Sequence, residues 1–306
     1  MKPAALRAAQ LAAPKPQRNW DARAAANFIC GGAGGGLLFC TALLAIAAPG
    51  SRAVAAGPWL AMALIGFGLT CVWFEIGRPL RALNVYRHIA TSWMTREAVV
   101  ALAVFGSGLA AALTGSVALS VLAGLCGAAF VYSQARILAA NKGIPAWRHP
   151  ASVPLVVATG LAEGCGLLPA VAVFTGVGVG AGLLLALLVL IGLRAAAWRR
   201  YRAGLGASGA PQAALKVLDA FAPRLLWFGG ILPALALVAL LLGMPGRGAV
   251  LAATAVLVAG SGAWLKFTLV RRAAFTQGLA MAHAPVRGRG PAGPAARPGW
   301  DTLARG

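Results

Sequence analysis

The sequence predicts an all-α polytopic membrane protein, a bundle of about eight transmembrane helices. Hydrophobic residues make up 60% of the 306 residues and charged residues only 11%, and the mean hydropathy is +0.80. Soluble domains carry about 25% charged residues. The apolar residues also fall into separate stretches of about 20 residues, the length that a helix needs to cross the hydrocarbon core. Composition and spacing therefore agree on a membrane-embedded helical bundle.

Eight apolar stretches follow one another along the chain, and two pairs of them are separated by very short connections. The connections at 114–116 and 175–176 predict tight helical hairpins, because a connection of so few residues can join only two helices that are antiparallel neighbours. The expected spans are 24–48, 54–74, 97–114, 117–138, 151–174, 176–196, 224–243 and 248–270.

The basic residues are distributed unequally between the two ends of the predicted bundle. With both termini on one side, 25 of the 27 Lys and Arg lie there, and only Arg52 and Arg247 lie opposite. Cytoplasmic loops collect Lys and Arg, so both termini are expected in the cytoplasm. The chain then divides into an N-terminal segment over 1–23, a transmembrane domain over 24–270 and a cytoplasmic tail over 271–306. Because these charges form no continuous basic face, they indicate contacts with lipid headgroups and not with nucleic acid.

The first span contains the sequence GGAGGG over 31–36. A dinucleotide-binding loop needs a strand before it and a helix after it, whereas these glycines lie inside an apolar stretch of helix length. Close helix packing through small residues is the favoured interpretation. A second interpretation is that the glycines let a flat ligand approach the backbone.

Glu163 is the only acidic residue well inside a predicted span. A carboxylate at the bilayer centre costs about 2.5 to 3.5 kcal/mol on insertion scales and is by default a candidate functional group. The alternative is a protonated Glu that hydrogen-bonds to a neighbouring helix.

An interfacial loop over 75–97, EIGRPLRALNVYRHIATSWMTRE, concentrates charge between two apolar stretches. The second span is expected to end near Gly77 and Pro79, since Gly caps a helix C-terminus and Pro cannot continue the helix. A short amphipathic helix over 80–89 is expected to lie in the membrane interface. Thr95 is expected to cap the third span and to place Glu97 in its first turn.

The two carboxylates of this loop are expected at opposite ends of helix dipoles. Glu97 lies near a helix start, where the dipole favours a negative charge, and Glu75 lies at a helix end, where the dipole disfavours it. Glu75 is therefore expected to take a proton more easily, with Arg78, Arg81 and Arg96 as available partners. Such a pair could hold and protonate a quinone headgroup. The alternative is a loop whose charges only anchor the helices.

Neither cysteines nor histidines form a metal-site pattern in the sequence. The five cysteines lie in apolar stretches without a CxxC pair, and His88, His149 and His283 lie in loops or the tail. No intrinsic haem or iron–sulfur cluster is expected, which argues against a cytochrome b-type anchor. Glu163 leaves open a secondary transporter or proton-coupled carrier, although such folds usually contain an internal repeat and the charged loop has no second copy.

The charged loop resembles a known family of membrane subunits. GRPLRA over 77–82 and SWMTRE over 92–97 are similar to the anchor subunit of the dimethyl sulfoxide reductase type (DmsC), related to the NrfD-like subunits. The span count and the glycine-rich first span extend the resemblance to most of the eight spans. It implies a subunit of anaerobic electron transport that is not catalytic alone and that binds quinone as an exchangeable substrate. It also implies an iron–sulfur subunit and a molybdopterin catalytic subunit as partners at the bacterial inner (plasma) membrane.

The predicted quinone site has four residues, two of which follow from the motif. Arg81 and Glu97 match the family's quinone-site arginine and glutamate, and Glu75 and Arg78 complete the site. Glu75 stands where the family usually has a histidine, and a carboxyl group can also take and release protons. Most members carry their soluble subunits in the periplasm, whereas the cytoplasmic loop expected here implies cytoplasmic partners. In this respect the chain resembles the membrane subunit of phenylacetyl-CoA:acceptor oxidoreductase.

Overall fold

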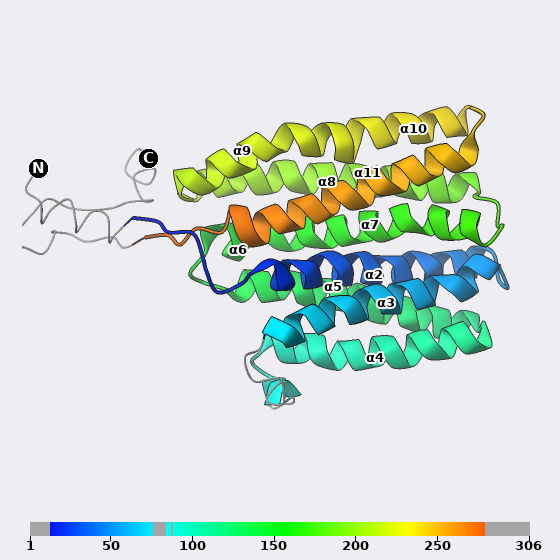
Figure 1. Ribbon diagram of the computed structural model, residues 1–306, viewed down its shortest axis with the longest axis horizontal. Coiled ribbons are helices and arrows are strands. Elements are labelled where there is room, and N and C mark those ends of the chain that lie inside the picture. The colour runs from blue at the N-terminus through cyan, green and yellow to red at the C-terminus, as the bar shows by residue number, and fades with distance from the viewer. Residues whose placement is uncertain (1–12, 76–83, 87, 279–306) are drawn as a thin grey trace, which may run out of the picture.

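The computed structural model describes residues 13–75, 84–86 and 88–278 of the chain. Eight helical segments in these ranges are long and apolar enough to cross a membrane, which confirms the predicted fold class (Figure 1). The elements are α2 (Ala22–Ala47), α3 (Arg52–Glu75), α4 (Trp93–Thr114), α5 (Val117–Ala140), α6 (Pro145–Arg148), α7 (Ser152–Phe174), α8 (Ala181–Ala207), α9 (Gln212–Leu226), the π-helix η2 (Trp227–Ile231), α10 (Leu232–Leu241), α11 (Arg247–Phe267) and the π-helix η3 (Thr268–Arg272).

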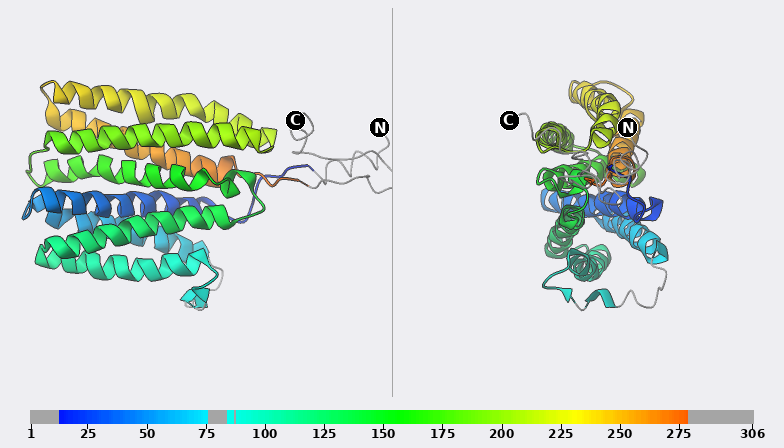
Figure 2. Two further views of the ribbon diagram at one scale, coloured as in Figure 1. Left: turned by 180° about the vertical axis from the view of Figure 1, so that it is seen from behind. Right: turned by 90° about the vertical axis from the view of Figure 1, so that its left-hand side faces the viewer.

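Helix α2 lies in the middle of the bundle. It packs against α3, α5 and α7, and it also contacts α11. The end-on view in Figure 2 shows α3, α4 and α5 on one side of α2 and the helices from α7 onward on the other. A polar side chain on α2 can therefore meet residues from both halves of the bundle.

Close packing around α2 depends on its glycines. A Cβ added at Gly34 would lie 2.6 Å from the Ala61 carbonyl oxygen of α3, and one at Gly35 would lie 2.7 Å from the Gly127 carbonyl oxygen of α5. A Cβ at Gly36 would overlap the backbone of α7. Small residues let helix backbones approach each other closely in membranes, so the packing interpretation of the glycine-rich span is confirmed.

Several helix ends differ from those expected. Helix α8 continues to Ala207 and α9 begins at Gln212, so most of the basic stretch expected as a loop between the sixth and seventh spans is helical. Arg and Lys have good helix propensity, and charge therefore ends the membrane-embedded part of a helix without ending the helix. The connection between α7 and α8 covers 175–180 and is longer than predicted, because its glycines favour neither helix.

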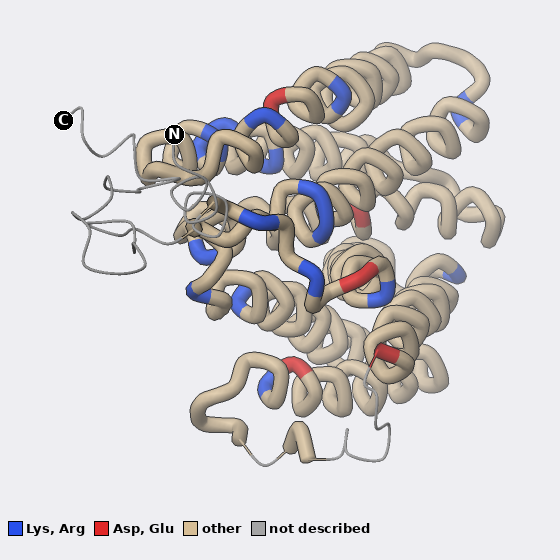
Figure 3. Tube along the Cα trace, turned by 60° about the vertical axis from the view of Figure 1, so that its left-hand side comes forward, with Lys and Arg blue, Asp and Glu red and all other residues tan. Residues whose placement is uncertain are grey.

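Lys and Arg gather at the end of the bundle where both chain ends emerge (Figure 3), and Arg52 and Arg247 begin helices at the opposite end. Two residues contradict the expected distribution. Arg194 and Lys266 are only 1% exposed and lie inside the bundle instead of in a loop or at a terminus. Without them the asymmetry is still 23 against two, so the predicted orientation does not depend on them.

The segment before α2 and the segment after η3 lie side by side as they leave the bundle (Figure 1). Pro16 and Phe275 form an antiparallel bridge, and the Gln17 N–H donates to the Ala274 carbonyl at 2.8 Å. This pairing holds the N-terminal segment across the end of the bundle, next to the cavity described below.

Candidate functional site

A cavity of about 260 Å³ lies where the start of α2, the end of α3, the start of α4 and the end of α5 meet. Both predicted carboxylates, Glu75 and Glu97, line it, although they are far apart in the sequence. Met94 is 46% exposed, so the cavity reaches the outer surface of the bundle. The lining residues are Asn19, Trp20, Ala24, Asn27, Phe28, Val72, Glu75, Met94, Glu97 and Ile137.

Glu97 is buried in the wall of this cavity, with 6% of its surface exposed. Its Oε1 accepts a hydrogen bond from the Asn27 side-chain amide at 3.3 Å. The Gln134 amide donates to the Asn27 backbone carbonyl at 2.9 Å and supports this arrangement. Because the hydrogen-bond partner of Glu97 is a neutral amide, the carboxylate can be protonated without leaving a buried cation unpaired.

The start of α4 corrects the predicted cap. Ser92 is the N-cap, with an extended backbone, and its side chain accepts from the Thr95 N–H at 3.4 Å. The Thr95 hydroxyl donates to the Val85 carbonyl instead, because the preceding loop folds back onto it. Glu97 consequently lies in the second turn of α4, where it faces the bundle interior, and not in the first turn.

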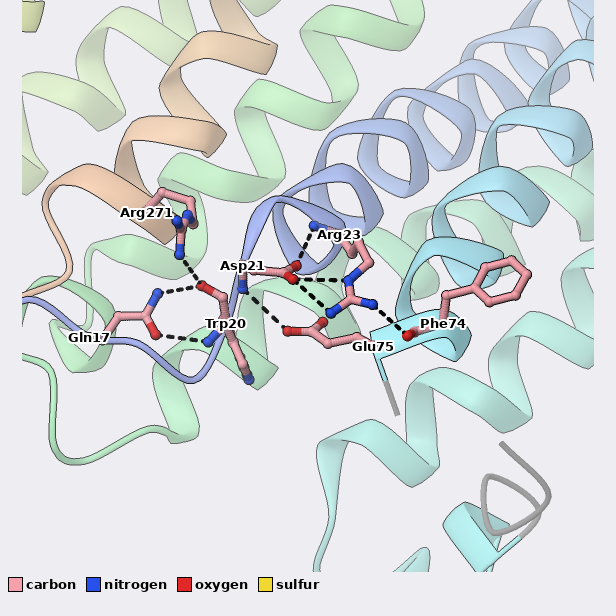
Figure 4. A network of polar contacts seen from close by, with 7 residues as sticks. All are labelled: Gln17, Trp20, Asp21, Arg23, Phe74, Glu75 and Arg271. Carbon is pink, nitrogen blue, oxygen red and sulfur yellow. Dashed lines mark hydrogen bonds and ion pairs between the residues drawn. The ribbon is translucent and has the colours of Figure 1, made fainter. Parts of the chain in front are cut away.

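Glu75 is the last residue of α3, as expected, and belongs to a polar network at the mouth of the cavity (Figure 4). Its Oε1 accepts from the Asp21 N–H at 3.3 Å. Arg23 forms an ion pair with Asp21 at 2.8 Å and donates to the Phe74 carbonyl at 2.6 Å. The hydrogen bond from Arg23 holds the pKa of the Asp21 carboxyl below its usual value. Which of Glu75 and Glu97 takes a proton more readily stays a prediction.

The arginines of the interfacial loop are only partly described. Arg78 and Arg81 lie outside the described residues, and so does half of the helix predicted over 80–89, of which 84–86 form a 3₁₀ turn. The positions of these two arginines at the cavity stay a prediction. Arg96 donates to two backbone carbonyls of the preceding turn at 3.0 and 2.6 Å, so it stabilises the loop and pairs with neither carboxylate. The cation closest to Glu75 in the described network is Arg23, which the sequence assigned to topology alone.

Sequence reasoning missed three residues of the site. Trp20 lines the cavity, stacks on Trp147 with ring centroids 4.7 Å apart, and its carbonyl accepts from Arg271 at 2.9 Å (Figure 4). Asn27 and Gln134 reach the Glu97 region from α2 and α5. For these two a signal was present, since polar side chains inside apolar spans are costly and usually have a specific role. Trp20 carried no such signal, because its place depends on the pairing of the two chain ends.

Glu163 forms a second buried polar group deeper in the bundle. Its Oε2 accepts from the Lys266 ammonium of α11, and both side chains are 1% exposed. Glu163 thus bonds to a neighbouring helix, but in an ion pair with a lysine and not as the protonated Glu of the alternative interpretation. Its partner is a lysine that the sequence had placed at the cytoplasmic end.

The part of the chain that the structure describes contains no group of side chains suited to bind a metal ion. No three His, Cys, Asp or Glu side chains there lie close enough together to hold a metal ion. The five cysteines are free thiols, and His88 and His149 lie outside the spanning helices. His283 lies outside the described residues.

Eight apolar helices, with a cavity between α2, α3, α4 and α5 that two carboxylates line, define the chain as a polytopic membrane protein with a polar site near one end of the bundle. The family model of the DMSO reductase anchor subunit (DmsC) matches residues 28–200, more than half of the chain. The chain therefore belongs to the DmsC family, the membrane anchor subunits of DMSO reductase-type complexes. The match runs from α2 into α8, six of the eight spans, and includes both carboxylates, in agreement with the resemblance expected over most of the spans. Comparison with curated proteins finds no match.

Proposed function

We propose that this anchor subunit exchanges electrons and protons with the quinone pool at the cavity between α2, α3, α4 and α5. The observation that supports this function best is the placement of Glu75 and Glu97, from two different helices, on one cavity that reaches the outer surface of the bundle. Quinone reduction needs two electrons and two protons at two ring oxygens. A buried carboxyl beside an apolar wall is a suitable proton donor and acceptor for such a ring.

The cavity matches a planar headgroup better than a whole lipid-like molecule. Its volume of about 260 Å³ is just below the range of pockets that enclose drug-sized ligands, so the isoprenoid tail would remain in the membrane past Met94. Phe28 and Ile137 provide apolar walls, and Glu97 is oriented by Asn27. In this arrangement Glu97 would exchange a proton with one ring oxygen, and Glu75, near the mouth, would serve the other.

The partners are expected at the basic end of the bundle. The soluble subunits of the proposed complex are an iron–sulfur electron-transfer subunit and a molybdopterin catalytic subunit, because electrons must reach the cavity from a redox group outside the membrane. The excess of Lys and Arg at this end supports a cytoplasmic location in a bacterial inner membrane. A cytoplasmic complex fits a substrate such as a CoA ester, as in phenylacetyl-CoA:acceptor oxidoreductase.

The test uses the intact complex purified with its soluble subunits. Glu97→Gln is expected to lower the quinone-linked rate by about 100-fold, the usual contribution of a general acid–base group. Arg81→Ala is expected to weaken quinone binding by about tenfold, as for a lost hydrogen bond to a charged group. Asp219→Asn is the matched control, because its ion pair with Arg202 lies elsewhere.

Activity with a soluble dye as electron acceptor should stay unchanged in all three variants, which shows that the complex remains assembled. If Glu97→Gln and Arg81→Ala both kept the wild-type quinone-linked rate, the site assignment would be wrong.

A further inference from the structure

The buried charged side chains of the described residues are Glu97, Glu163, Arg194 and Lys266. They come from α4, α7, α8 and α11, and they comprise two acids and two bases. A buried charge is tolerated in a membrane when it is paired or serves a pathway for ions or protons. The formal charges of these four groups sum to zero, and a proton that moves among them leaves that sum unchanged.

Two amides lie between Glu97 and the Glu163–Lys266 ion pair. Asn27 donates to Glu97, and Gln134 donates to the Asn27 backbone. A Cβ added at Gly32 would lie 3.7 Å from the Gln134 Oε1 and 3.1 Å from the Lys266 Cε, so both side chains meet over the same glycine of α2. Because Gly32 has no side chain, the Gln134 amide and the Lys266 ammonium can approach each other there.

Three buried oxygens along this path have no hydrogen-bond partner among the described residues: Asn27 Oδ1, Gln134 Oε1 and Glu163 Oε1. The three side chains are 5%, 0% and 1% exposed. Buried acceptors of this kind are normally satisfied by internal water, which makes about three hydrogen bonds to otherwise unpartnered groups. Water at these oxygens would connect the amides to the Lys266 ammonium in a continuous hydrogen-bonded chain.

Of the two buried bases, only Lys266 can release a proton. A guanidinium stays protonated in proteins, whereas a lysine becomes neutral when its surroundings favour this. Arg194 donates to the Val258 carbonyl at 3.1 Å and to the Gly229 carbonyl, and it lies close enough to act electrostatically on Glu163. If Lys266 loses its proton, Glu163 still has the Arg194 cation as counter-charge.

We propose that Lys266, held by Glu163, exchanges a proton with Glu97 through internal water that Gln134 and Asn27 hold in place. In this step the ammonium becomes a neutral amine and the carboxylate becomes a carboxylic acid, no electron moves, and the four charges sum to zero before and after. Given the proposed quinone function, Lys266 restores the proton that Glu97 has delivered to a bound ring. Of the charged groups of α9, Asp219 pairs with Arg202, Arg224 lies over Trp264 and Lys216 is exposed.

A purely structural role for the ion pair would be to hold α7 against α11, and two measurements on the full-length chain in lipid nanodiscs distinguish the roles. The first is NMR of ¹³C-labelled lysine, which is feasible because the chain has five lysines. We expect Lys266 to change from ammonium to amine over the pH range in which Glu97 changes its protonation. Lys216, which is exposed on α9, is the internal control.

The second measurement is an infrared pH titration of the Glu97 carboxyl band, identified by its loss in Glu97→Gln. Lys266→Arg keeps the cation and the ion pair, but the guanidinium cannot release a proton. We therefore expect the titration of the Glu97 carboxyl band to move to lower pH, by at least a tenfold change in proton concentration. An unchanged band in a folded Lys266→Arg variant would overturn the proposal. So would a wild-type Lys266 that stays an ammonium up to pH 9, and this second result needs no variant to fold.

Neither measurement uses a quinone, so this inference and the proposed function can fail separately. Coupled titration in a chain that binds no short-tailed naphthoquinone would leave the proton exchange standing and remove the quinone site. Normal quinone binding with uncoupled titration would do the reverse.

Discussion

Removing one partner of the Glu163–Lys266 ion pair at a time is expected to destabilise the protein unequally. Both side chains are 1% exposed, and breaking a buried pair costs about 3 to 5 kcal/mol because the remaining charge is uncompensated. Arg194 makes the two variants different. Lys266→Met leaves Glu163 beside the Arg194 cation, whereas Glu163→Gln leaves two buried cations without a counter-charge.

We therefore expect Glu163→Gln to cost about 5 kcal/mol and Lys266→Met about 3 kcal/mol or less, the two ends of that range. The double variant leaves only the Arg194 cation and should be more stable than Glu163→Gln alone. The free energy of unfolding can be measured by tryptophan fluorescence in mixed micelles as the SDS fraction rises. As the control, Asp219→Asn breaks an exposed pair with Arg202 at 2.7 Å and should cost less than about 1 kcal/mol.

Which of the two single variants loses more stability shows whether Arg194 compensates the charge of Glu163. Equal losses, or a larger loss in Lys266→Met, would show that Arg194 does not compensate Glu163. The charge argument for a removable proton on Lys266 would then lose its basis.

Two further variants test the packing of α2 and the network at the cavity mouth. A Cβ at Gly164 would lie 2.6 Å from the Gly36 Cα, so Gly164→Ala should cost about 1 to 3 kcal/mol by overpacking, while Gly192→Ala, with open space around it, should be neutral or stabilising in the same unfolding assay. Asp21→Asn keeps a good N-cap residue but removes the charge that Arg23 stabilises. Because folding lowers the pKa of Asp21 from 3.8, its charge stabilises the protein above that pH and this contribution is lost as the pH falls. The difference in Tm between wild type and Asp21→Asn should thus be present at about pH 6 and shrink steadily as the pH falls below 3.8, and a difference that does not shrink in acid would contradict the network.

Much of the helical architecture could be predicted because hydrophobicity over about 20 residues is a local property. The turn after Thr114 was predicted closely for the same reason, since Gly115 and Ser116 provide a left-handed C-cap and an N-cap side by side. The end of the sixth span and the start of the seventh were predicted wrongly. The helices reach Ala207 and begin at Gln212, because basic residues continue a helix after it leaves the membrane.

Part of the candidate site could also be predicted. Glu75 and Glu97 stood out as acids next to apolar spans, and both line the cavity. Asn27 and Gln134 carried a signal as polar side chains inside apolar spans, but their place beside Glu97, and that of Trp20 at the cavity, depends on how separate segments pack together. The cap at Ser92 was missed for a related reason. The Thr95 hydroxyl is taken by a carbonyl of the preceding loop, and only the folded chain brings the two together.

The sequence by itself determined that the chain is a membrane bundle with eight spans, that its positive charge lies at one end, and that two carboxylates flank a charged loop. These properties depend on residue type and spacing along the chain. Only the tertiary structure decided which charges are buried. Lys266 and Arg194 looked like topology signals, yet Lys266 lies inside the bundle, paired with Glu163 from a helix 103 residues away in the sequence. A buried charge needs a partner to offset its desolvation. Which residue becomes that partner depends on the packing of α7, α8 and α11 around α2.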